Sequence, residues 1–164
     1  MSNKLKRISS FSVDHTKLEP GIYVSRCDVV KTPIITTFDL RLLRPNIEVP
    51  IEQNALHTIE HLGATFLRNS DKKDYVIYFG PMGCRTGFYL VFNDCTNAQE
   101  IRELVIKMFE FIRDFKGEIP GATPEECGNY IDHDLALAKT YAIDYLSEIT
   151  KNCKTEYDYL PSKN

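Results

Sequence analysis

The sequence predicts an α+β fold, a single domain in which a largely antiparallel sheet packs against helices. Strand-forming segments come in two successive pairs, helical segments show three- and four-residue periodicity, and the two kinds do not alternate regularly as parallel βαβ units do. A chain of 164 residues can bury about 70% of its unfolded surface in one core. Without an internal repeat or a long linker, residues 1–164 are predicted to form one domain, with loose ends at 1–9 and 152–164.

The first pair of strands is predicted at residues 22–30 and 34–43, where β-branched and aromatic residues dominate. Thr32-Pro33 separates the two segments, and Arg44-Pro45-Asn46 ends the second. Arg41 falls on the opposite side of this strand from its apolar residues, and by itself it is interpreted as a surface charge. The apolar side carries Thr36, Phe38, Leu40 and Leu42.

A helix is predicted from about Gln53 to Leu67, after Pro50 and before Asn69-Ser70-Asp71. Its apolar residues recur at helical spacing and include Leu56, Ile59, Leu62, Phe66 and Leu67. The second pair of strands follows at residues 75–79 and 88–92, joined by a loop rich in glycine at 80–87.

Two further helices complete the predicted fold. The first begins near Asn97 and ends at Gly117, and its apolar stripe is interpreted as core. The last begins after Asp134, a predicted N-cap, and extends to about residue 151.

Composition excludes several function classes. The net charge is −3 without a basic block, so the sequence favours neither nucleic acid nor an anionic membrane as a partner. No apolar run has the length that crosses a bilayer, and no hydrophobic stretch follows the basic N-terminus. The five cysteines are scattered and odd in number, which predicts reduced thiols in a cytoplasmic protein.

The motif H-x-x-E-H at residues 57–61 predicts a metal site on the first helix. Residues four apart share one helix face, so His57 and His61 can point toward one ion. Glu60 lies about 60° round the helix from His57, beside the metal, where it suits a general acid or base. The alternative is a pair of buried, hydrogen-bonded imidazoles, and short motifs do produce false matches.

A catalytic site needs a third protein ligand and one open position. The candidates are Cys127, His133, Glu125 and Glu126, all in or near the segment rich in glycine and proline at 120–128. Two histidines with a cysteine suit zinc or ferrous iron. An isolated cysteine has no specific pattern, so Cys127 has the alternative of a small buried hydrophobic residue.

Cys84 is the second candidate for chemistry. Glycines flank it, and Arg85 is adjacent, and positive surroundings lower a thiol pKa from about 8.5. Such a thiolate can act as a nucleophile or carry a proton, although by itself a packed turn cysteine is the simpler interpretation. Cys27, Cys95 and Cys153 are predicted to be structural, and His15 to be a surface or capping residue.

Taken together, these segments resemble the S-ribosylhomocysteine lyase (LuxS) family, in the family's order from about residue 10 to about residue 150. The most specific match is the loop and strand from Pro81 to Tyr89, P-M-G-C-R-T-G-F-Y, beside which H-x-x-E-H alone is a weak signal. The other matching segments are Ser10-Phe11, Asp14-His15-Thr16, Phe38-Asp39-Leu40-Arg41, Pro45-Asn46, residues 57–62, Glu126-Cys127-Gly128 and His133-Asp134-Leu135.

The resemblance implies a lyase that cleaves S-ribosylhomocysteine to homocysteine and dihydroxypentanedione, the precursor of a bacterial quorum-sensing signal. It implies one divalent metal per subunit, Fe²⁺ in the cell and often Zn²⁺ after purification. It also implies a homodimer with active sites at the subunit interface. By position, it implies metal ligation by His57, His61 and Cys127, acid–base roles for Cys84 and Glu60, and substrate contacts by Ser10, Phe11, His15 and Arg41.

One segment departs from the family pattern. Many members carry an acidic residue six positions before the loop cysteine and an Ile-Ser pair before the proline, whereas this chain has Tyr78 followed by Phe79-Gly80. Any substrate hydrogen bond made by that acid is therefore not transferred to this chain.

The chemistry of such a cleavage agrees with these residues. Breaking a thioether without redox requires a carbonyl that migrates along the opened sugar through enediolates until the thiolate can be eliminated. A metal with an open position stabilises each enediolate. Proton transfers on two faces need two groups, for which Cys84 in the earlier shift and Glu60 in the later steps are the hypothesis.

Two other classes remain open from the residues alone. H-x-x-E-H also occurs in inverzincin proteases, where Glu125 or Glu126 would be the third ligand, and a deformylase-like hydrolase would use two histidines and a cysteine. A binding module could instead close a structural metal site with four protein ligands: His57, His61, Cys127 and His133.

Overall fold

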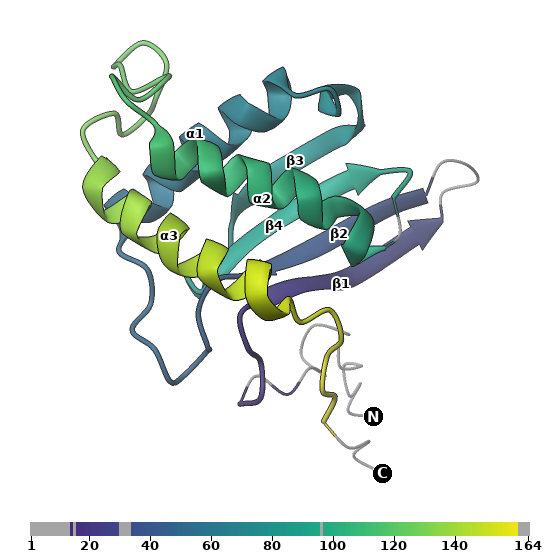
Figure 1. Ribbon diagram of the computed structural model, residues 1–164. Coiled ribbons are helices and arrows are strands. Elements are labelled where there is room, and N and C mark those ends of the chain that lie inside the picture. Colours follow the sequence, from purple (N-terminus) through teal and green to yellow (C-terminus); the bar gives the residue numbers. More distant parts are fainter. Residues whose placement is uncertain (1–13, 15, 30–33, 96, 161–164) are drawn as a thin grey trace, which may run out of the picture.

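Four antiparallel strands form one sheet in the computed structural model, which describes residues 14, 16–29, 34–95 and 97–160. The strands are β1 (Gly21–Val29), β2 (Ile34–Arg41), β3 (Val76–Pro81) and β4 (Gly87–Asn93). Their order across the sheet is β1-β2-β4-β3, and every neighbouring pair is antiparallel. Each predicted strand pair is a hairpin, and the two hairpins meet where β2 pairs with β4 (Figure 1).

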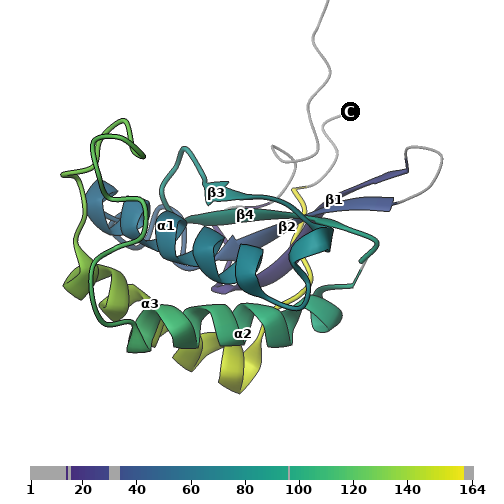
Figure 2. The same ribbon diagram turned by 90° about the horizontal axis from the view of Figure 1, so that it is seen from above.

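Three helices lie on one face of this sheet (Figure 2). They are α1 (Gln53–Asn69), α2 (Ala98–Asp114) and α3 (Leu135–Asn152), and a single 3₁₀ turn, η2 (Lys73–Tyr75), precedes β3. Helix α1 packs along β3, while α2 and α3 pack against each other. The predicted α+β class is therefore confirmed.

Side chains cap the second and third helices at Asn97, where the sequence predicts the helix start, and at Asp134, the predicted N-cap. The Asn97 side chain accepts a hydrogen bond from the backbone N–H of Gln99 at 2.8 Å, and that of Asp134 accepts one from Leu137 at 2.9 Å. Each bond satisfies a backbone donor that the first helical turn leaves without a partner.

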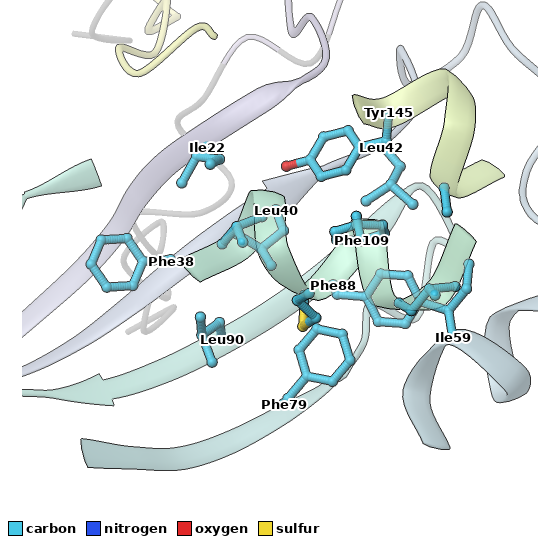
Figure 3. Close-up of a cluster of buried hydrophobic side chains, with 14 of the residues drawn as sticks. Ile22, Phe38, Leu40, Leu42, Ile59, Phe79, Phe88, Leu90, Phe109 and Tyr145 are labelled. Carbon is cyan, nitrogen blue, oxygen red and sulfur yellow. The ribbon is translucent and has the colours of Figure 1, made fainter. Parts of the chain in front are cut away.

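The core fills the space between the sheet and the helices. Alternate residues of β2 point into it, as the sequence predicts, and Thr36, Phe38 and Leu40 are fully buried. Phe38 and Leu40 share one core with side chains from all three helices, among them Ile59, Phe109 and Tyr145 (Figure 3). Burial of a large apolar side chain contributes about 1.5–3 kcal/mol, so this shared core fixes α1 on the sheet.

The opposite face of the sheet contradicts one prediction. Arg41 is only 2% exposed and Asp39 only 3%, so Arg41 is not a surface charge. The guanidinium donates to both carboxylate oxygens of Asp39, at 3.1 and 2.5 Å. A buried charge needs such a partner, because an unpaired one is costly to desolvate.

The C-terminal tail also differs from expectation. The sequence predicts a loose tail over residues 152–164, of which the structure describes 152–160, but the backbone carbonyl of Lys154 accepts a hydrogen bond from the backbone N–H of Ile22 at 2.9 Å. The Tyr157 ring stacks on Tyr23 with centroids 4.7 Å apart, and its hydroxyl donates to Asp39 at 3.0 Å. Tyrosine can pack its ring and still satisfy its hydroxyl, and here it ties residues 154–157 to the sheet.

In the described part of the chain, none of the helices combines the length and apolar character that crossing a membrane requires.

Candidate active site

His57 and His61 project from one face of α1, one turn apart. Their rings are 4.6 Å apart and nearly perpendicular, at 89°. The Nδ1 atom of His57 lies 3.0 Å from the carbonyl oxygen of Asp132, and Nδ1 of His61 lies 2.8 Å from that of Pro120. A carbonyl can only accept, so both Nδ1 atoms carry the proton and both Nε2 atoms are left with lone pairs for a metal.

Cys127 brings a thiol to the same place from the loop that follows α2. Its sulfur lies 3.4 Å from Nε2 of His57, and the backbone N–H of Asn129 donates to it at 3.4 Å. Two donors that are 2.0–2.3 Å from one tetrahedral ion are themselves about 3.3–3.8 Å apart. This separation therefore fits a shared metal, and Asn129 would stabilise the thiolate.

A third histidine joins this group. Ligating atoms of four residues, His57, His61, Cys127 and His133, all lie within 4.8 Å of one another. Burial, and then repulsion from His57 and His61, holds the pKa of His133 below its usual value, which favours the neutral ring. Among the described residues, the group that could hold a metal ion does not include Glu125 or Glu126, which the sequence left open as ligands.

Glu60 lies beside these residues in an open hollow of about 510 Å³. Its walls come from α1, from β3 and from the loop that carries Cys127, and the lining includes His57, Glu60, His61, Phe79, Glu126 and Cys127. The arrangement places the Glu60 carboxylate next to three side chains that can ligate a metal and are reached from solvent: His57, His61 and Cys127. Such a site can bind a small polar molecule and move protons on it.

Cys84 does not line this hollow, and its surroundings come from the β3–β4 loop and β2. Its sulfur is 3.2 Å from the Thr86 hydroxyl and 3.8 Å from a guanidinium nitrogen of Arg41. Burial raises the pKa of the Cys84 thiol, but hydrogen bonds from Thr86 and the charge of Arg41 outweigh it, so the pKa is lowered overall.

The positive neighbour of Cys84 is thus Arg41 rather than the adjacent Arg85. Cross-strand pairing explains the difference, because Arg41 of β2 lies opposite Gly87 of β4, at the end of the loop that carries Cys84. The Arg41 guanidinium also donates to the Thr86 hydroxyl at 2.6 Å. Thr86 and Asp39 are parts of this arrangement that sequence reasoning missed, and their place in the hairpin register was the available signal.

The family model for S-ribosylhomocysteinase (LuxS) matches residues 8–156. The chain belongs to the LuxS family. Among its curated relatives, the S-ribosylhomocysteine lyase of Phocaeicola vulgatus is 48% identical over 160 residues, covering 97% of this chain and 99% of the relative. Those of Finegoldia magna and Borrelia garinii subsp. bavariensis are each 50% identical over 93% of this chain, covering 96% and 97% of the relatives.

Three of the residues that the LuxS resemblance implies in substrate binding lie outside the described part of the chain: Ser10, Phe11 and His15. The fourth, Arg41, is buried beside Cys84. The structure therefore brings His57, His61, Cys127 and Glu60 together at one hollow, and Arg41 and Cys84 together elsewhere in the same chain.

The departure from the LuxS pattern at Tyr78 has a local structural counterpart. Tyr78 is half exposed on β3, and its phenol lies over Gly80, where a side chain would collide with the hydroxyl. Tyrosine at 78 therefore fits a glycine at 80, whereas a bulkier residue at 80 would collide with the tyrosine.

Proposed function

We propose that this protein cleaves the thioether of S-ribosylhomocysteine, releasing homocysteine and 4,5-dihydroxy-2,3-pentanedione. The observation that carries the proposal is the open hollow in which His57, His61 and Cys127 converge beside Glu60, in a chain of the LuxS family. The relatives named S-ribosylhomocysteine lyase are 48–50% identical to this chain, and the matches cover almost their whole length.

The proposed cofactor is one divalent metal held by His57, His61 and Cys127. Its chemistry would be Lewis-acid stabilisation of the negative charge that develops on neighbouring sugar oxygens. The donor set accommodates Fe²⁺ or Zn²⁺, and we infer Fe²⁺ in the cell, with Zn²⁺ able to replace it in purified protein. The backbone carbonyls that accept the Nδ1 protons of His57 and His61 support metal ligation through the Nε2 atoms of these two histidines.

In the proposed reaction, side chains of this protein move protons on the ring-opened substrate. In each of two successive shifts, the carbon that bears the neighbouring hydroxyl loses a proton and the old carbonyl carbon gains one. The hydroxyl proton is lost as the old carbonyl oxygen takes one up, so the carbonyl moves from C1 to C2 and then to C3. A proton is then removed from C4, the thiolate leaves C5, and the resulting enol takes a proton at C5 to give a methyl ketone. The sequence consumes neither water nor an oxidant.

Two groups are available for these transfers. Cys84, with its lowered pKa, is assigned to the first shift, and Glu60 to the second shift and the elimination. Each such group contributes about 10²–10⁴-fold to the rate. Ser10, Phe11, His15 and Arg41 are proposed to contact the substrate.

The active form is inferred to be a cytoplasmic homodimer with active sites at the subunit interface. Cys84 does not line the hollow that holds Glu60, so one chain alone does not present both groups to one substrate there. A second copy that brings its Cys84 to this hollow would complete the site. The products would serve homocysteine recycling and, in bacteria that use it, the synthesis of an autoinducer.

The test is release of free thiol from S-ribosylhomocysteine by protein that has been loaded with Fe²⁺ under anaerobic conditions. We expect release from the wild type, and none from metal-stripped protein or from Cys84→Ala. A Cys27→Ala variant is the matched control, because Cys27 lies on β1 and is exposed. Absence of thiol release from folded, metal-loaded protein would reject the proposal, and peptide hydrolysis would then be assayed.

A further inference from the structure

Asp39 and Tyr157 have no role in the reaction proposed above, yet both are joined to the residues around Cys84. Asp39 lies on β2, between the inward-facing Phe38 and Leu40, so its side chain is on the sheet face opposite the core. It is nevertheless only 3% exposed. A buried carboxylate is costly to desolvate unless it is paired, so its partners decide what it does.

Asp39 holds the Arg41 guanidinium by two hydrogen bonds. Nε of Arg41 donates to one carboxylate oxygen at 3.1 Å, and Nη2 donates to the other at 2.5 Å. Two bonds between a planar guanidinium and a carboxylate fix the direction of the guanidinium as well as its distance. With Nε and Nη2 held in this way, Nη1 is the nitrogen that faces the Cys84 loop.

Nη1 of Arg41 meets this loop at two atoms. It donates to the Thr86 hydroxyl at 2.6 Å and lies 3.8 Å from the Cys84 sulfur. The hydroxyl is itself 3.2 Å from that sulfur. A rotated guanidinium would lose these contacts, so the pairing with Asp39 sets where the positive charge lies relative to the thiol.

Tyr157 of the C-terminal tail bonds to Asp39 as well. Its hydroxyl donates at 3.0 Å to the same carboxylate oxygen that accepts from Nη2 of Arg41. The Tyr157 ring is held in turn by stacking on Tyr23, with ring planes 6° apart. The tail is thereby connected to Cys84 through two buried side chains, Asp39 and Arg41.

Three tyrosines surround Asp39. Tyr23 of β1 and Tyr89 of β4 are opposite it on the two neighbouring strands, and Tyr157 comes from the tail. Burial, and then the negative charge of Asp39, raises the pKa of each phenol, so all three stay neutral where a thiol titrates. The fixed charges of this group are therefore those of Asp39 and Arg41.

We propose that Asp39 is a positioning residue that aims the Arg41 guanidinium at Cys84, and that Tyr157 of the C-terminal tail holds the Asp39 carboxylate in place. The inference deepens the proposed function and rests on the acid–base role that it gives to Cys84. Asp39 acts here through Arg41, not by contact with substrate. The thiolate then depends on the direction of the guanidinium as well as on its charge.

The test measures the pH midpoint of alkylation by iodoacetamide on zinc-loaded protein, with the label located at Cys84 by peptide mass analysis. Asp39→Asn keeps the shape but replaces one acceptor by an amide that cannot accept. The released guanidinium should stabilise the thiolate less and raise the midpoint by about 0.5–1 pH, the equivalent of one hydrogen bond. Loss of the negative charge alone would act in the opposite direction and lower the midpoint.

Three further variants separate position from charge. Asp39→Glu keeps the charge but moves the carboxylate by one methylene, and it should also raise the midpoint. Tyr157→Phe keeps the stack on Tyr23 but frees the carboxylate, and a smaller rise is expected. Tyr23→Phe is the matched control, because it removes a hydroxyl bond of similar length, 2.9 Å to the Glu19 carbonyl, and should leave the midpoint unchanged.

A lower midpoint in Asp39→Asn would overturn the proposal by making Asp39 only an opposing charge. An unchanged midpoint in this variant would overturn it by making the role structural, and if the variant does not fold, an unchanged midpoint in Tyr157→Phe has the same meaning. The acid limb of kcat/KM should move with the midpoints. If the midpoints shift as expected while wild-type protein releases no thiol from S-ribosylhomocysteine, the positioning of Arg41 stands and the proposed substrate is wrong.

Discussion

Among single residues, Thr86 is the one on which the reactivity of Cys84 most depends. Its hydroxyl lies between the thiol, at 3.2 Å, and the Arg41 guanidinium, at 2.6 Å. It therefore both bonds the sulfur and holds the cation that stabilises the thiolate. Hydrogen bonding and a nearby positive charge both favour the charged form, whereas burial opposes it.

Replacing Thr86 with valine should raise the pKa of Cys84, because the shape is kept and the hydrogen bond is lost. The rate of alkylation by iodoacetamide across a pH series measures the thiolate directly, and a wild-type midpoint below the free-thiol value of about 8.5 is expected. The acid limb of kcat/KM should move to higher pH in the same direction. Thr86→Ser, which keeps the hydroxyl, is the matched control.

The lowered pKa of Cys84 also determines how the stability of the folded protein depends on pH. A thiol whose pKa is lowered on folding contributes stability above the unfolded value of about 8.5, and that contribution is lost as pH falls through the folded pKa. An alkylation midpoint in Thr86→Val that equals the wild-type value would show that the Thr86 hydroxyl does not lower the pKa of Cys84.

Replacing Cys127 with alanine should remove the metal. A change in the surroundings of a ligand costs about 10–100-fold in affinity, so loss of a ligand itself should cost more. Zinc content after dialysis is expected to fall from about one ion per chain to near none. Because metal that binds only the folded state stabilises it, chelator should lower the Tm of wild-type protein and leave that of Cys127→Ala unchanged.

Cys27→Ala, at an exposed position on β1, provides the comparison for that experiment. Full metal content in Cys127→Ala would exclude Cys127 as a ligand.

Among elements, the contact between α1 and β3 is made without a side chain at Gly63. A β-carbon on Gly63 would collide with the Phe79 ring, which itself stacks on Phe88 with centroids 5.1 Å apart. Phe79 also lines the hollow beside Glu60. The close approach of helix to strand therefore positions both the face of α1 that carries His57 and His61 and one wall of the hollow.

Gly63→Ala should destabilise the protein, even though alanine is favoured over glycine in a helix by about 1 kcal/mol. Overpacking in a core costs about 1–3 kcal/mol, which outweighs that gain. Urea unfolding measures the difference. The double variant Gly63→Ala with Phe79→Leu should recover part of the loss, and simple additivity of the two changes would rule out the proposed clash.

The C-terminal tail is the second element whose contact has a measurable consequence. Tyr157→Phe keeps the stacking on Tyr23 but removes the hydrogen bond to the buried Asp39. Hydrogen bonds to charged groups contribute about 1.5–3 kcal/mol, so a loss of about this size in the free energy of unfolding is expected. Tyr159→Phe, at an exposed position with no side-chain hydrogen bond described, should have almost no effect.

At the scale of the whole molecule, the residues proposed for catalysis and metal binding form two separate groups within one chain. The metal-type donors and Glu60 share one hollow, while Cys84 and Arg41 form a second group on β2 and the β3–β4 loop. A symmetric pair of chains can bring the two groups together twice, because a twofold axis generates two equivalent sites.

Mixing two inactive variants tests this arrangement. If Cys84 and Glu60 of one site come from different chains, random exchange of Cys84→Ala with Glu60→Gln subunits makes half of the dimers mixed, each with one intact site, and should restore about a quarter of wild-type activity. Thiol release from S-ribosylhomocysteine is the assay, and sedimentation confirms exchange. If both residues of a site come from the same chain, the mixture stays inactive.

The sequence by itself determined the elements and the chemistry of α1. Period-two alternation placed Phe38 and Leu40 of β2 in the core, helical spacing put His57 and His61 on one face, and Asn97 and Asp134 were identifiable as caps, because these features depend on neighbours only a few residues away.

Only the tertiary structure decided which distant groups meet. The carbonyl partner of His57 is 75 residues away, and the hydrogen bond from Arg41 to Thr86 spans 45. Such pairs are set by strand register and by the return of a loop onto α1, which no local pattern specifies. For the same reason Arg41, interpreted from the sequence as a surface charge, is buried beside Asp39 and Cys84, and His133 stacks on the proposed metal ligand His57.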